Sequence, residues 1–377
     1  MTVLLDKSTG ALVGAAVGDA LGGATETALP EEIRARYGGW VDGIAPPFHA
    51  DWATARPLAP YHKGDGHITD DTLVTHALVR VYAAKRDHLD AFDVADLLVA
   101  DLTERVVFIP DMEREAVAFH RLAAAERWLV TRLRHAHADP REAGVGNVVN
   151  CGAAMYMAPV GVVNAGDPAS AYAEAIEVAG AHQHSFGREA AGVFAAAVAA
   201  AMTAGATVDD VVSAALEVAH DGTRAAIAAV SKEAREHTDW RGALGRLRAA
   251  MAPFDTVGDD YRNPGLGARR PSRLHAIEEL PVALGLLLVA GGDYREAVLG
   301  AVNYGRDADS TATMAGAIAG ALGGAAAVPA QWSSAVAAAS RADLAEPARV
   351  LAEVAAEVFA LDRARFARRE RRFGDLA

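Results

Sequence analysis

The sequence predicts an all-α protein, and three features of the chain support this prediction. Alanine, the residue with the highest intrinsic helix propensity, is abundant. Apolar residues recur at the three- and four-residue spacing of a helix face, whereas the apolar-polar alternation of a half-buried strand is nearly absent. With 377 residues, 52% of them hydrophobic, the chain can bury a large core. We expect one domain over residues 1–377, because no repeat and no Pro/Ser-rich linker divides it.

The first predicted helix covers Gly10–Gly22. Its apolar residues follow helical spacing, and Gly14, Gly18 and Gly22 form a stripe beside them. A stripe of glycines lets another backbone approach closely. Gly316 and Gly320 repeat the pattern late in the chain, so the two helices that carry these stripes are predicted to be deeply buried and tightly packed.

The same periodicity predicts helices along the rest of the chain. They cover residues 69–84, 91–105, 111–136, 169–181, 187–204, 208–219, 222–236, 274–290, 293–303, 309–323, 329–338 and 344–361. Two segments rich in Gly and Pro, Tyr37–Gly66 and Phe254–Pro271, interrupt the pattern. Long ordered loops in compact domains are often functional, so each segment is either the rim of a binding cleft or a surface connection.

The charge and the cysteine content narrow the classes of function. Asp and Glu outnumber Lys and Arg by 49 to 36, and the net charge of -13 argues against a nucleic-acid binder, which needs a broad basic face. The single cysteine, Cys151, excludes an intramolecular disulfide and a structural zinc site built on thiolates. We therefore expect a cytoplasmic protein whose ligands are small molecules or cations.

Neither a signal peptide nor a membrane span is predicted. Asp6 and Lys7 place charge where a secretory signal needs an apolar run. Two uncharged stretches, Ala190–Val208 and Ser310–Ser340, consist mainly of small residues and contain too little Leu, Ile and Phe for membrane insertion. We interpret both stretches as buried helices.

Two clusters of acidic and hydroxyl residues open predicted helices. The run Thr69–Thr72, Thr-Asp-Asp-Thr, precedes an apolar helical run, where Thr and Asp are ordinary N-terminal caps. Asp307, Asp309 and Ser310 open the helix of the second glycine stripe. Two carboxylates at the start of a helix that is predicted to be buried are hard to explain as solvated surface.

If the two clusters meet, their carboxylates repel one another unless a cation lies between them. Oxygen atoms of Asp, Ser and Thr are the ligands that Mg²⁺, Mn²⁺ and Ca²⁺ prefer. The spacing alone leaves two interpretations open, helix caps or a site for divalent metal ions.

Three motifs together resemble the ADP-ribosylglycohydrolase (DraG-like) family. They are the run Gly14–Gly22 followed by Glu26, the Thr69–Thr72 cluster, and Asp307–Ser310 followed by the small-residue run Met314–Gly323. They occur in the order of the family and cover about residues 10–325. The resemblance implies an all-α orthogonal multi-helix bundle that binds two divalent cations, Mg²⁺ or Mn²⁺, between the aspartate clusters.

The resemblance also assigns roles to individual residues. It implies a set of metal ligands, with Ser310 standing where the family usually has Thr: Thr69, Asp70, Asp71, Asp307, Asp309 and Ser310. It implies that Glu26 lies near the scissile ribosyl bond as a catalytic carboxylate, with Asp307 and Asp309 as further candidates. His182 matches a histidine that lines the ribose and phosphate pocket. The alternatives are a surface carboxylate for Glu26 and a His-x-His metal site for His182.

The chain departs from the family pattern at two places. The run Cys151–Tyr156, Cys-Gly-Ala-Ala-Met-Tyr, stands where Asn-Gly-small-small-Met-Arg is common, and Gly305-Arg306 stands where Gly-Gly is usual. We expect Gly152 and Tyr156 to contact the substrate and Arg306 to hold an anionic group beside the metal ligands. This redistribution of charge favours free, small ribosyl compounds over ADP-ribosylated protein.

Cys151 is interpreted as a buried small residue. A nucleophilic cysteine needs a His partner, and none can be placed beside Cys151 from the sequence. The Arg-rich segment Arg363–Arg372 is interpreted as a solvated helix end or an oligomer contact, and the sequence does not fix the oligomeric state.

Three functions remain open on the sequence. The first is hydrolysis of an N- or O-ribosyl bond in a small ribosylated molecule or an ADP-ribosylated target, where two metal ions and a carboxylate would position the water and assist the leaving group. The second is an N-glycosidase that acts on a free nucleoside or nucleotide. The third is a non-catalytic, crystallin-like or binding member of the fold, which the complete set of acidic ligands disfavours.

Overall fold

The computed structural model describes residues 2–52, 62–261 and 273–376, and helices dominate this part of the chain. The elements follow one another in the order α1 (Val3–Gly22), α2 (Pro30–Tyr37), α3 (Asp70–Lys85), α4 (Ala91–Asp93), η1 (Val94–Leu98), α5 (Val99–Glu104), β1 (Val106–Ile109), η2 (Pro110–Met112), β2 (Arg114–Val117), η3 (Ala118–His120), α6 (Ala124–Val130), η4 (Thr131–His135), η5 (Pro140–Glu142), α7 (Ala158–Val163), α8 (Pro168–Gly180), α9 (Ser185–Ala201), α10 (Val208–Val218), α11 (Asp221–Ala234), α12 (Trp240–Met251), α13 (Glu279–Val289), α14 (Tyr294–Tyr304), α15 (Ala308–Gly323), η7 (Ala325–Ala327), α16 (Ala330–Ser340) and α17 (Glu346–Gly374). The predicted all-α fold class is confirmed.

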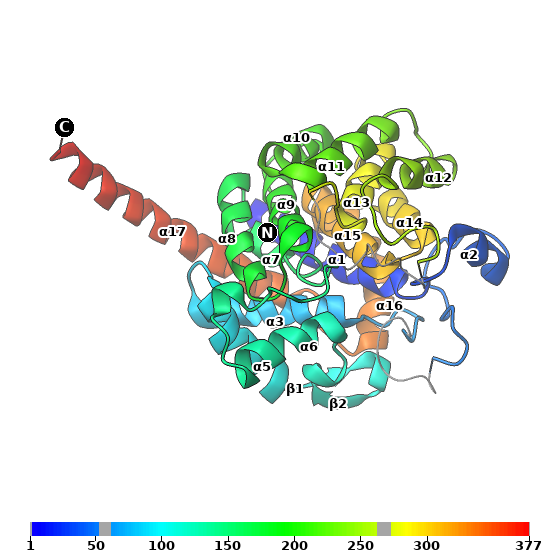
Figure 1. Cartoon of the computed structure of the whole chain (residues 1–377), viewed down its shortest axis with the longest axis horizontal. Helices are drawn as coiled ribbons and strands as arrows, with labels where there is room; N and C mark the ends of the chain where they lie inside the picture. The colour runs from blue at the N-terminus through cyan, green and yellow to red at the C-terminus, as the bar shows by residue number, and fades with distance from the viewer. Residues whose placement is uncertain (1, 53–61, 262–272, 377) are drawn as a thin grey trace.

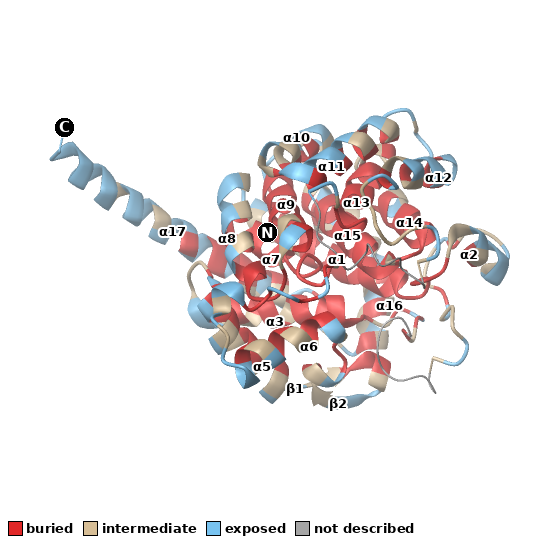
Figure 2. Ribbon diagram, viewed as in Figure 1, coloured by how far each residue is buried: buried red, intermediate tan, exposed pale blue. Residues whose placement is uncertain are grey.

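The helices α1 and α15 form the buried centre of the molecule (Figures 1 and 2). A Cβ atom added to Gly14 would lie 2.5 Å from the carbonyl oxygen of Gly316, and one added to Gly320 would lie 2.0 Å from that of Gly10. No side chain fits at these contacts, because real Cβ atoms do not approach backbone so closely. The two glycine stripes therefore face each other, and the prediction of two tightly packed, buried helices is confirmed.

The pairing of α1 with α15 is antiparallel, so the end of α1 lies beside the start of α15. A Cβ atom at Gly22 would lie 2.3 Å from the carbonyl oxygen of Ala308. This register brings Asp19 and Glu26, which lie near the end of α1, next to Asp309 in the first turn of α15.

A buried lysine stabilises the opposite end of the central pair. Lys7 Nζ donates hydrogen bonds to the carbonyl oxygens of Ala201 (2.8 Å), Ala321 (2.7 Å) and Leu322 (3.2 Å). These carbonyls belong to the last turns of α9 and α15, where helix carbonyls lack partners within the helix. One cationic side chain therefore closes the C-terminal ends of two helices at once.

The remaining helices surround the central pair. The helices α13 and α14 pack against α15, and α9 packs against α15 as well as α7, α8 and α10 (Figure 1). The helix α17 contacts α1, α3 and α7. Segments from both ends of the chain therefore share one core.

The structure differs from the predicted helix over residues 111–136. Part of a short β-hairpin and 3-10 turns occupy the first part of this range, and a regular helix begins only at α6. The strands β1 and β2 pair antiparallel, with Val106 opposite Val117 and Ile109 opposite Arg114. Pro110 follows β1 directly and opens the short turn η2 between the strands. Proline has no amide hydrogen and fixes its backbone φ angle, which suits a turn and not the middle of a helix.

The helices α2 and α7 are also absent from the prediction. They contain 8 and 6 residues, which is too short for a clear helical period to show in the sequence. Within the described residues, no helix is long and apolar enough to cross a membrane. The stretches Ala190–Val208 and Ser310–Ser340 instead contribute to α9 and α15, which are buried as predicted.

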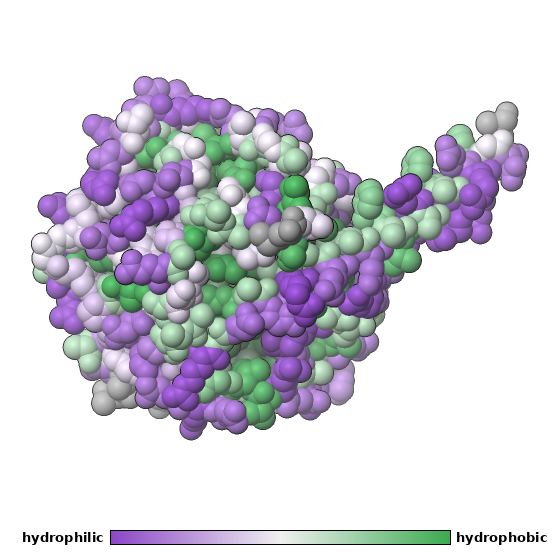
Figure 3. Space-filling model, turned by 180° about the vertical axis from the view of Figure 1, so that it is seen from behind, coloured by the Kyte–Doolittle hydropathy of each residue, from purple (hydrophilic) through white to green (hydrophobic). Residues whose placement is uncertain are grey.

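The helix α17 is packed at its start and projects from the body at its end (Figures 1 and 2). Leu351 and Val354 are fully buried, whereas Phe359, Phe366 and Phe373 are exposed. Seen from behind, the projecting part carries hydrophilic side chains mixed with hydrophobic ones (Figure 3). The predicted helix over residues 344–361 is therefore longer than expected and includes the Arg-rich segment.

Candidate active site

The candidate site lies where the end of α1 meets the first turns of α3 and α15. Asp19 is fully buried and accepts hydrogen bonds from the hydroxyl (2.6 Å) and the amide (3.0 Å) of Thr69. It also accepts hydrogen bonds from the amide (3.2 Å) and the hydroxyl of Thr72. Asp19 thereby holds the start of α3 against α1, and Thr69 Oγ1 lies 3.4 Å from Asp309 Oδ2 on α15.

The two aspartate clusters come together in the interior. Carboxylate oxygens of Asp70, Asp71 and Asp309 all lie within 4.8 Å of one another, and the three residues are buried. Burial, and next the neighbouring Asp309, raise the pKa of Asp71 well above its ordinary value, and the same two causes raise the pKa of Asp19 to about 7. Asp71 Oδ2 has no hydrogen-bond partner. A divalent cation held by these oxygens would remove the repulsion and give this atom a partner.

Asp307 and Ser310 lie beside Cys151. The Cys151 thiol donates hydrogen bonds to Asp307 Oδ2 (3.2 Å) and Ser310 Oγ (3.3 Å), and the Tyr261 hydroxyl donates to Asp307 Oδ2 (3.1 Å). Burial and the adjacent Asp309 raise the pKa of Asp307 to about 7. Asp307 is therefore a third carboxylate, after Asp71 and Asp19, whose ionised form the protein alone disfavours.

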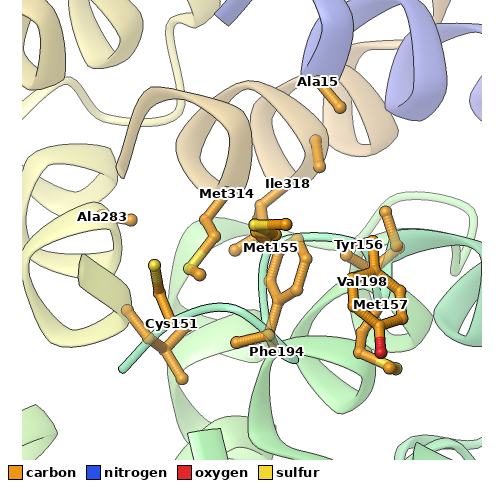
Figure 4. Packing of buried hydrophobic residues seen from close by; sticks show 14 of the residues in the cluster. Ala15, Cys151, Met155, Tyr156, Met157, Phe194, Val198, Ala283, Met314 and Ile318 are labelled. Carbon is orange, nitrogen blue, oxygen red and sulfur yellow. The ribbon is translucent and has the colours of Figure 1, made fainter. Parts of the chain in front are cut away.

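The surroundings of Cys151 agree with its interpretation as a buried small residue. Burial, and next Asp307, raise the pKa of the thiol well above its ordinary value, so the nucleophilic thiolate is disfavoured. The hydrogen-bond partners of the thiol are the oxygens of Asp307 and Ser310. Figure 4 shows Cys151 in the packed cluster with Met155 and Met314.

Glu26 lies in a loop that is tied to the start of α15. The amide of Thr27 donates to the carbonyl of Arg306 (2.6 Å), and the amide of Arg306 donates to the carbonyl of Ala28 (2.8 Å). Glu26 is 7% exposed, so the surface-carboxylate alternative does not describe it. Burial raises the pKa of Glu26, although the adjacent His62 opposes that shift.

A buried histidine that the sequence analysis did not single out faces Glu26. His62 Nε2 lies 2.5 Å from Glu26 Oε2 and 3.2 Å from Asp309 Oδ2. On the other side of the ring, Nδ1 lies 3.2 Å from Asp111 Oδ2 and 2.5 Å from Arg121 Nη2. Arg121 is fully buried, and its Nη1 lies 3.5 Å from Asp70 Oδ1. His62 and Arg121 thus place two basic side chains against the acidic cluster.

His182, Gly152 and Tyr156 form a separate group around another carboxylate. A Cβ atom at Gly152 would lie 2.3 Å from Glu126 Oε1, and His182 Nε2 lies 3.6 Å from the same oxygen. Burial, and next Asp70, raise the pKa of Glu126 to about 8, and burial lowers the pKa of His182 to about 4. His182 is therefore neutral and contacts Glu126, which in turn lies near Asp70 of the acidic cluster. The sequence analysis did not single out Glu126.

Tyr156, which the sequence analysis expects to contact the substrate, packs behind His182 in the structure. Tyr156 is fully buried, its hydroxyl lies 3.0 Å from His182 Nδ1, and the two rings stack with centroids 5.8 Å apart. Figure 4 places it in the core beside Val198 of α9. Tyr156 can position His182 but is not exposed to a ligand, because the large aromatic ring is more stable packed in the core.

The structure places the Arg306 side chain among buried carboxylates. Its guanidinium is buried, with Nε 2.6 Å from Glu278 Oε2 and Nη2 3.2 Å from Asp255 Oδ2, and it lies over the ring of Tyr261. A guanidinium that two buried carboxylates already neutralise is not free to hold an anionic substrate. The backbone of Arg306 has a φ of 59°, a left-handed conformation that favours glycine, which agrees with the Gly-Gly pattern usual in the family.

A cavity of about 110 Å³ opens beside Asp307. Its polar wall includes Asn150, Asp255, Tyr261, Glu278, Glu279 and Asp307. Glu279 Oε2 is buried without a hydrogen-bond partner, and burial, followed by Asp307, raises the pKa of Glu279 well above its ordinary value. The cavity therefore offers acceptors to a ligand rich in hydroxyl or amino groups.

Both segments that interrupt the helical pattern reach the site. Asp255 and Tyr261 belong to Phe254–Pro271, and His62 belongs to Tyr37–Gly66, as the cleft-rim interpretation predicts. Residues 53–61 and 262–271 of these segments lie outside the described residues. His62, Asp111 and Arg121 belong to no motif, and the only signal for His62 in the sequence is its place in a Gly/Pro-rich segment.

Comparison with solved structures establishes the fold. A structure described as "ADP-ribosylglycohydrolase-related protein complex" superimposes with a TM-score of 0.56 at 22% sequence identity, over 95% of this chain and 99% of that chain. A comparison with curated proteins gives no match. The structural likeness therefore shows the class of fold, an all-α helical bundle.

The sequence profile described as ADP-ribosylglycohydrolase matches residues 1–365. The match covers almost the whole chain, so the protein belongs to the ADP-ribosylglycohydrolase family. Family membership supports a glycohydrolase-type function, and the resemblance of the three sequence motifs is confirmed.

Proposed function

We propose that the protein is a divalent-metal-dependent hydrolase of N- or O-ribosyl bonds. The observation that carries the proposal is the meeting of two aspartate clusters from α3 and α15 in the interior, with Asp71 Oδ2 left without a partner. Buried carboxylates are ordinarily paired or bound to metal. The family supports hydrolysis at a glycosidic bond, and this arrangement supports its dependence on metal.

The residues that would hold the ions supply oxygen atoms throughout. They are Thr69, Asp70, Asp71, Asp307, Asp309 and Ser310, and the ions would be two Mg²⁺ or Mn²⁺. When bound, such ions orient ribose hydroxyls and make a nearby water molecule a better nucleophile at neutral pH. Asp19 would not bind the ions itself but would position the ligand Thr69, because Asp19 accepts hydrogen bonds from its amide and hydroxyl.

Glu26 would transfer the proton. Hydrolysis of a ribosyl bond passes through an oxocarbenium-like state and needs an acid for the leaving group or a base for water. Glu26 is buried beside Asp309 and His62, and burial raises its pKa above the ordinary value of a carboxyl group. Asp307 and Asp309 are further candidates for this role.

A free nucleoside or nucleotide is the second candidate substrate, in which case the protein is an N-glycosidase. The cavity beside Asp307, about 110 Å³, is smaller than the roughly 300–1,000 Å³ of sites that take drug-sized ligands. The nearby guanidinium of Arg306 is neutralised by Glu278 and Asp255. Both observations favour a small, uncharged ribosyl compound over an ADP-ribosylated target.

The experiment compares three substrates with and without metal. The chelated protein is supplied with Mg²⁺ or Mn²⁺ and incubated with an ADP-ribosylated protein, a ribonucleoside monophosphate or an unphosphorylated nucleoside, and release of the ribosyl product is measured. We expect metal-dependent release, fastest for the unphosphorylated nucleoside. Release that chelation leaves unchanged would contradict the proposal.

Asp309→Ala tests the metal site itself. The variant should lose at least one ion in elemental analysis together with its activity, because Asp309 lies within reach of both Asp71 and Glu26. Asp139→Ala is the matched control, since Asp139 is an exposed helix cap. Equal metal content in Asp309→Ala and in the wild type would remove Asp309 from the site.

A further inference from the structure

His62 occupies the acidic site from a loop that carries no family motif. The imidazole is buried, and its Nε2 lies 2.5 Å from Glu26 Oε2 and 3.2 Å from Asp309 Oδ2. One donor atom from each of His62, Glu26 and Asp309 lies within 4.8 Å of the other two. This group is distinct from the group of Asp70, Asp71 and Asp309, although both share Asp309.

The opposite side of the imidazole is held by an ionised carboxylate. His62 Nδ1 lies 3.2 Å from Asp111 Oδ2, and Asp111 also accepts hydrogen bonds from Arg121 Nε (2.8 Å) and the amide of Lys63 (3.0 Å). Burial opposes ionisation of Asp111, but Arg121 and His62 hold its pKa far below the ordinary value. Arg121 Nη2 also lies 2.5 Å from Nδ1, but an arginine N–H can only donate, so a proton on Nδ1 has Asp111 as its acceptor.

A carboxylate behind Nδ1 is the usual support of a metal-binding histidine. It accepts the Nδ1 proton, fixes the orientation of the ring and leaves the lone pair of Nε2 for the metal ion. In this protein Nε2 faces two carboxylate oxygens and not a neutral acceptor. Asp111 therefore stands behind the imidazole of His62 as its supporting carboxylate. Glu26 and Asp309 provide oxygen atoms on the side of Nε2, where a cation would bind.

Two buried atoms lack a hydrogen-bond partner at this place. They are His62 Nε2 and Glu26 Oε2, whose contact is short but does not have hydrogen-bond geometry. Buried polar atoms are rarely left without a partner, and such an atom requires an explanation. A metal ion bound by both atoms, which would then lie farther apart than 2.5 Å, supplies a partner for each of them.

We propose that His62 is an imidazole ligand of the divalent ion that Asp309 holds, with Glu26 as the third donor. This inference rests on the proposed function, because it assumes that the acidic site binds metal. A nitrogen ligand suits Mn²⁺ and later transition metals better than Mg²⁺, which prefers oxygen. The centre is thus selective for Mn²⁺ over Mg²⁺ through a residue that the family motifs do not contain.

The experiment observes the ligand directly by pulsed electron paramagnetic resonance. The full-length protein is freed of metal and loaded with Mn²⁺, and spin-echo modulation from a directly bound ¹⁴N nucleus is recorded. We expect nitrogen modulation in the wild type and none in His62→Gln, with Mn²⁺ still held by the carboxylates. His67→Gln is the matched control, because His67 lies in the same segment and its Nδ1 contacts the Gly64 carbonyl instead.

Binding measurements give an independent readout. We expect His62→Gln to weaken the binding of Mn²⁺ on the order of tenfold or more and the binding of Mg²⁺ much less. His67→Gln should change neither affinity. If His62→Gln fails to fold, the wild-type spectrum alone shows whether a nitrogen atom is bound to Mn²⁺. Bound Mn²⁺ without nitrogen modulation, or modulation that persists in His62→Gln, would overturn the role of His62 and leave the oxygen site standing. A wild-type protein that binds no Mn²⁺ would overturn both this inference and the metal dependence of the proposed function.

Discussion

At the scale of single residues, a substitution of Glu26 distinguishes proton transfer from metal binding. Glu26→Gln keeps the size of the side chain and one oxygen atom that can bind a metal ion, but the amide cannot transfer a proton. We expect kcat on an established substrate to fall by at least about 100-fold, the usual contribution of a general acid or base. At saturating metal concentration, metal content measured by elemental analysis should stay at the wild-type level. Retained turnover at that metal content would remove Glu26 from the reaction.

Arg306 provides the opposite kind of test, since its placement indicates a structural role. Among the described residues, Arg306→Ala leaves Arg248 as the cation paired with the buried carboxylates of Glu278 and Asp255. Breaking a buried ion pair typically costs about 3 kcal/mol or more, and urea denaturation should show a loss of that order. KM should change equally for a phosphorylated and an unphosphorylated substrate. A rise in KM only for the phosphorylated one would restore Arg306 as an anion ligand.

The residues of the site were predictable only where a motif carries them. Thr69–Thr72 and Asp307–Ser310 open their helices in the sequence as in the structure, so their carboxylates could be named in advance. His62 and Glu126 could not, because each reaches the site through the packing of distant segments. The ion pairs of Arg306 were unpredictable for the same reason, since its partners Glu278 and Asp255 lie far from it in the sequence.

At the scale of elements, the glycine stripes of α1 and α15 determine whether the clusters meet. A Cβ atom at Gly18 would lie 2.1 Å from the carbonyl oxygen of Ala312, so Gly18→Ala must push the helices apart. We expect a loss of about 1–3 kcal/mol in the free energy of unfolding, as for other overpacked cores. Metal affinity should fall with it, because α15 carries Asp309.

Gly245→Ala is the matched control for that substitution. Gly245 lies on α12, where an added Cβ would meet no atom within 4 Å. Alanine has a higher helix propensity than glycine, so this variant should gain about 0.5–1 kcal/mol. Equal effects of Gly18→Ala and Gly245→Ala on unfolding would show that the close contact between α1 and α15 does not matter.

A histidine at the base of α17 makes the docking of that helix depend on pH. His88 Nδ1 lies 2.5 Å from the buried Glu174 of α8, and Nε2 lies 2.8 Å from Asp362 of α17. The hydrogen bond with Glu174, and also that with Asp362, raise the pKa of His88 to about 9.

The raised pKa of His88 fixes the sign of the pH effect. The protonated ring contributes stability that is fully present below about pH 6.5, the value of an unperturbed histidine, and is lost as the pH rises through about 9. The difference in unfolding free energy between wild type and His88→Gln should therefore be larger at pH 6.5 than above pH 9. Urea denaturation at the two pH values measures it, and a difference that grows with pH would contradict this assignment.

The elements themselves were predictable in proportion to their length and amphipathic pattern. The predicted helix Gly10–Gly22 lies within α1, and the predicted helix over residues 309–323 nearly coincides with α15. The hairpin β1–β2 was missed because its strands have only 4 residues each, too few for alternation to stand out. Its stability comes from pairing and from packing against the helices, which the local sequence does not encode.

At the scale of the whole molecule, the two halves of α17 have different roles. Up to Val358 the helix packs against α1, α3 and α7, whereas beyond Arg365 its side chains are mostly exposed. Arg365 itself forms an ion pair with Asp87. Removal of residues 366–377 therefore takes away little buried apolar area. We expect Tm, measured by calorimetry, to shift by less than about 2 °C, with unchanged metal binding.

The packed half of α17 supplies the control for this truncation. Leu351 is fully buried, so Leu351→Ala should cost about 2–5 kcal/mol, the range for cavities left by a large side chain in a core. The exposed half combines Phe366 and Phe373 with a run of arginines on a chain whose net charge is -13, which suits contact with an acidic surface. If the truncated protein instead loses much of its thermal stability, and the wild-type Tm depends on protein concentration, the Arg-rich segment is an oligomer contact. A concentration-independent Tm that truncation leaves unchanged identifies it as a solvated helix end.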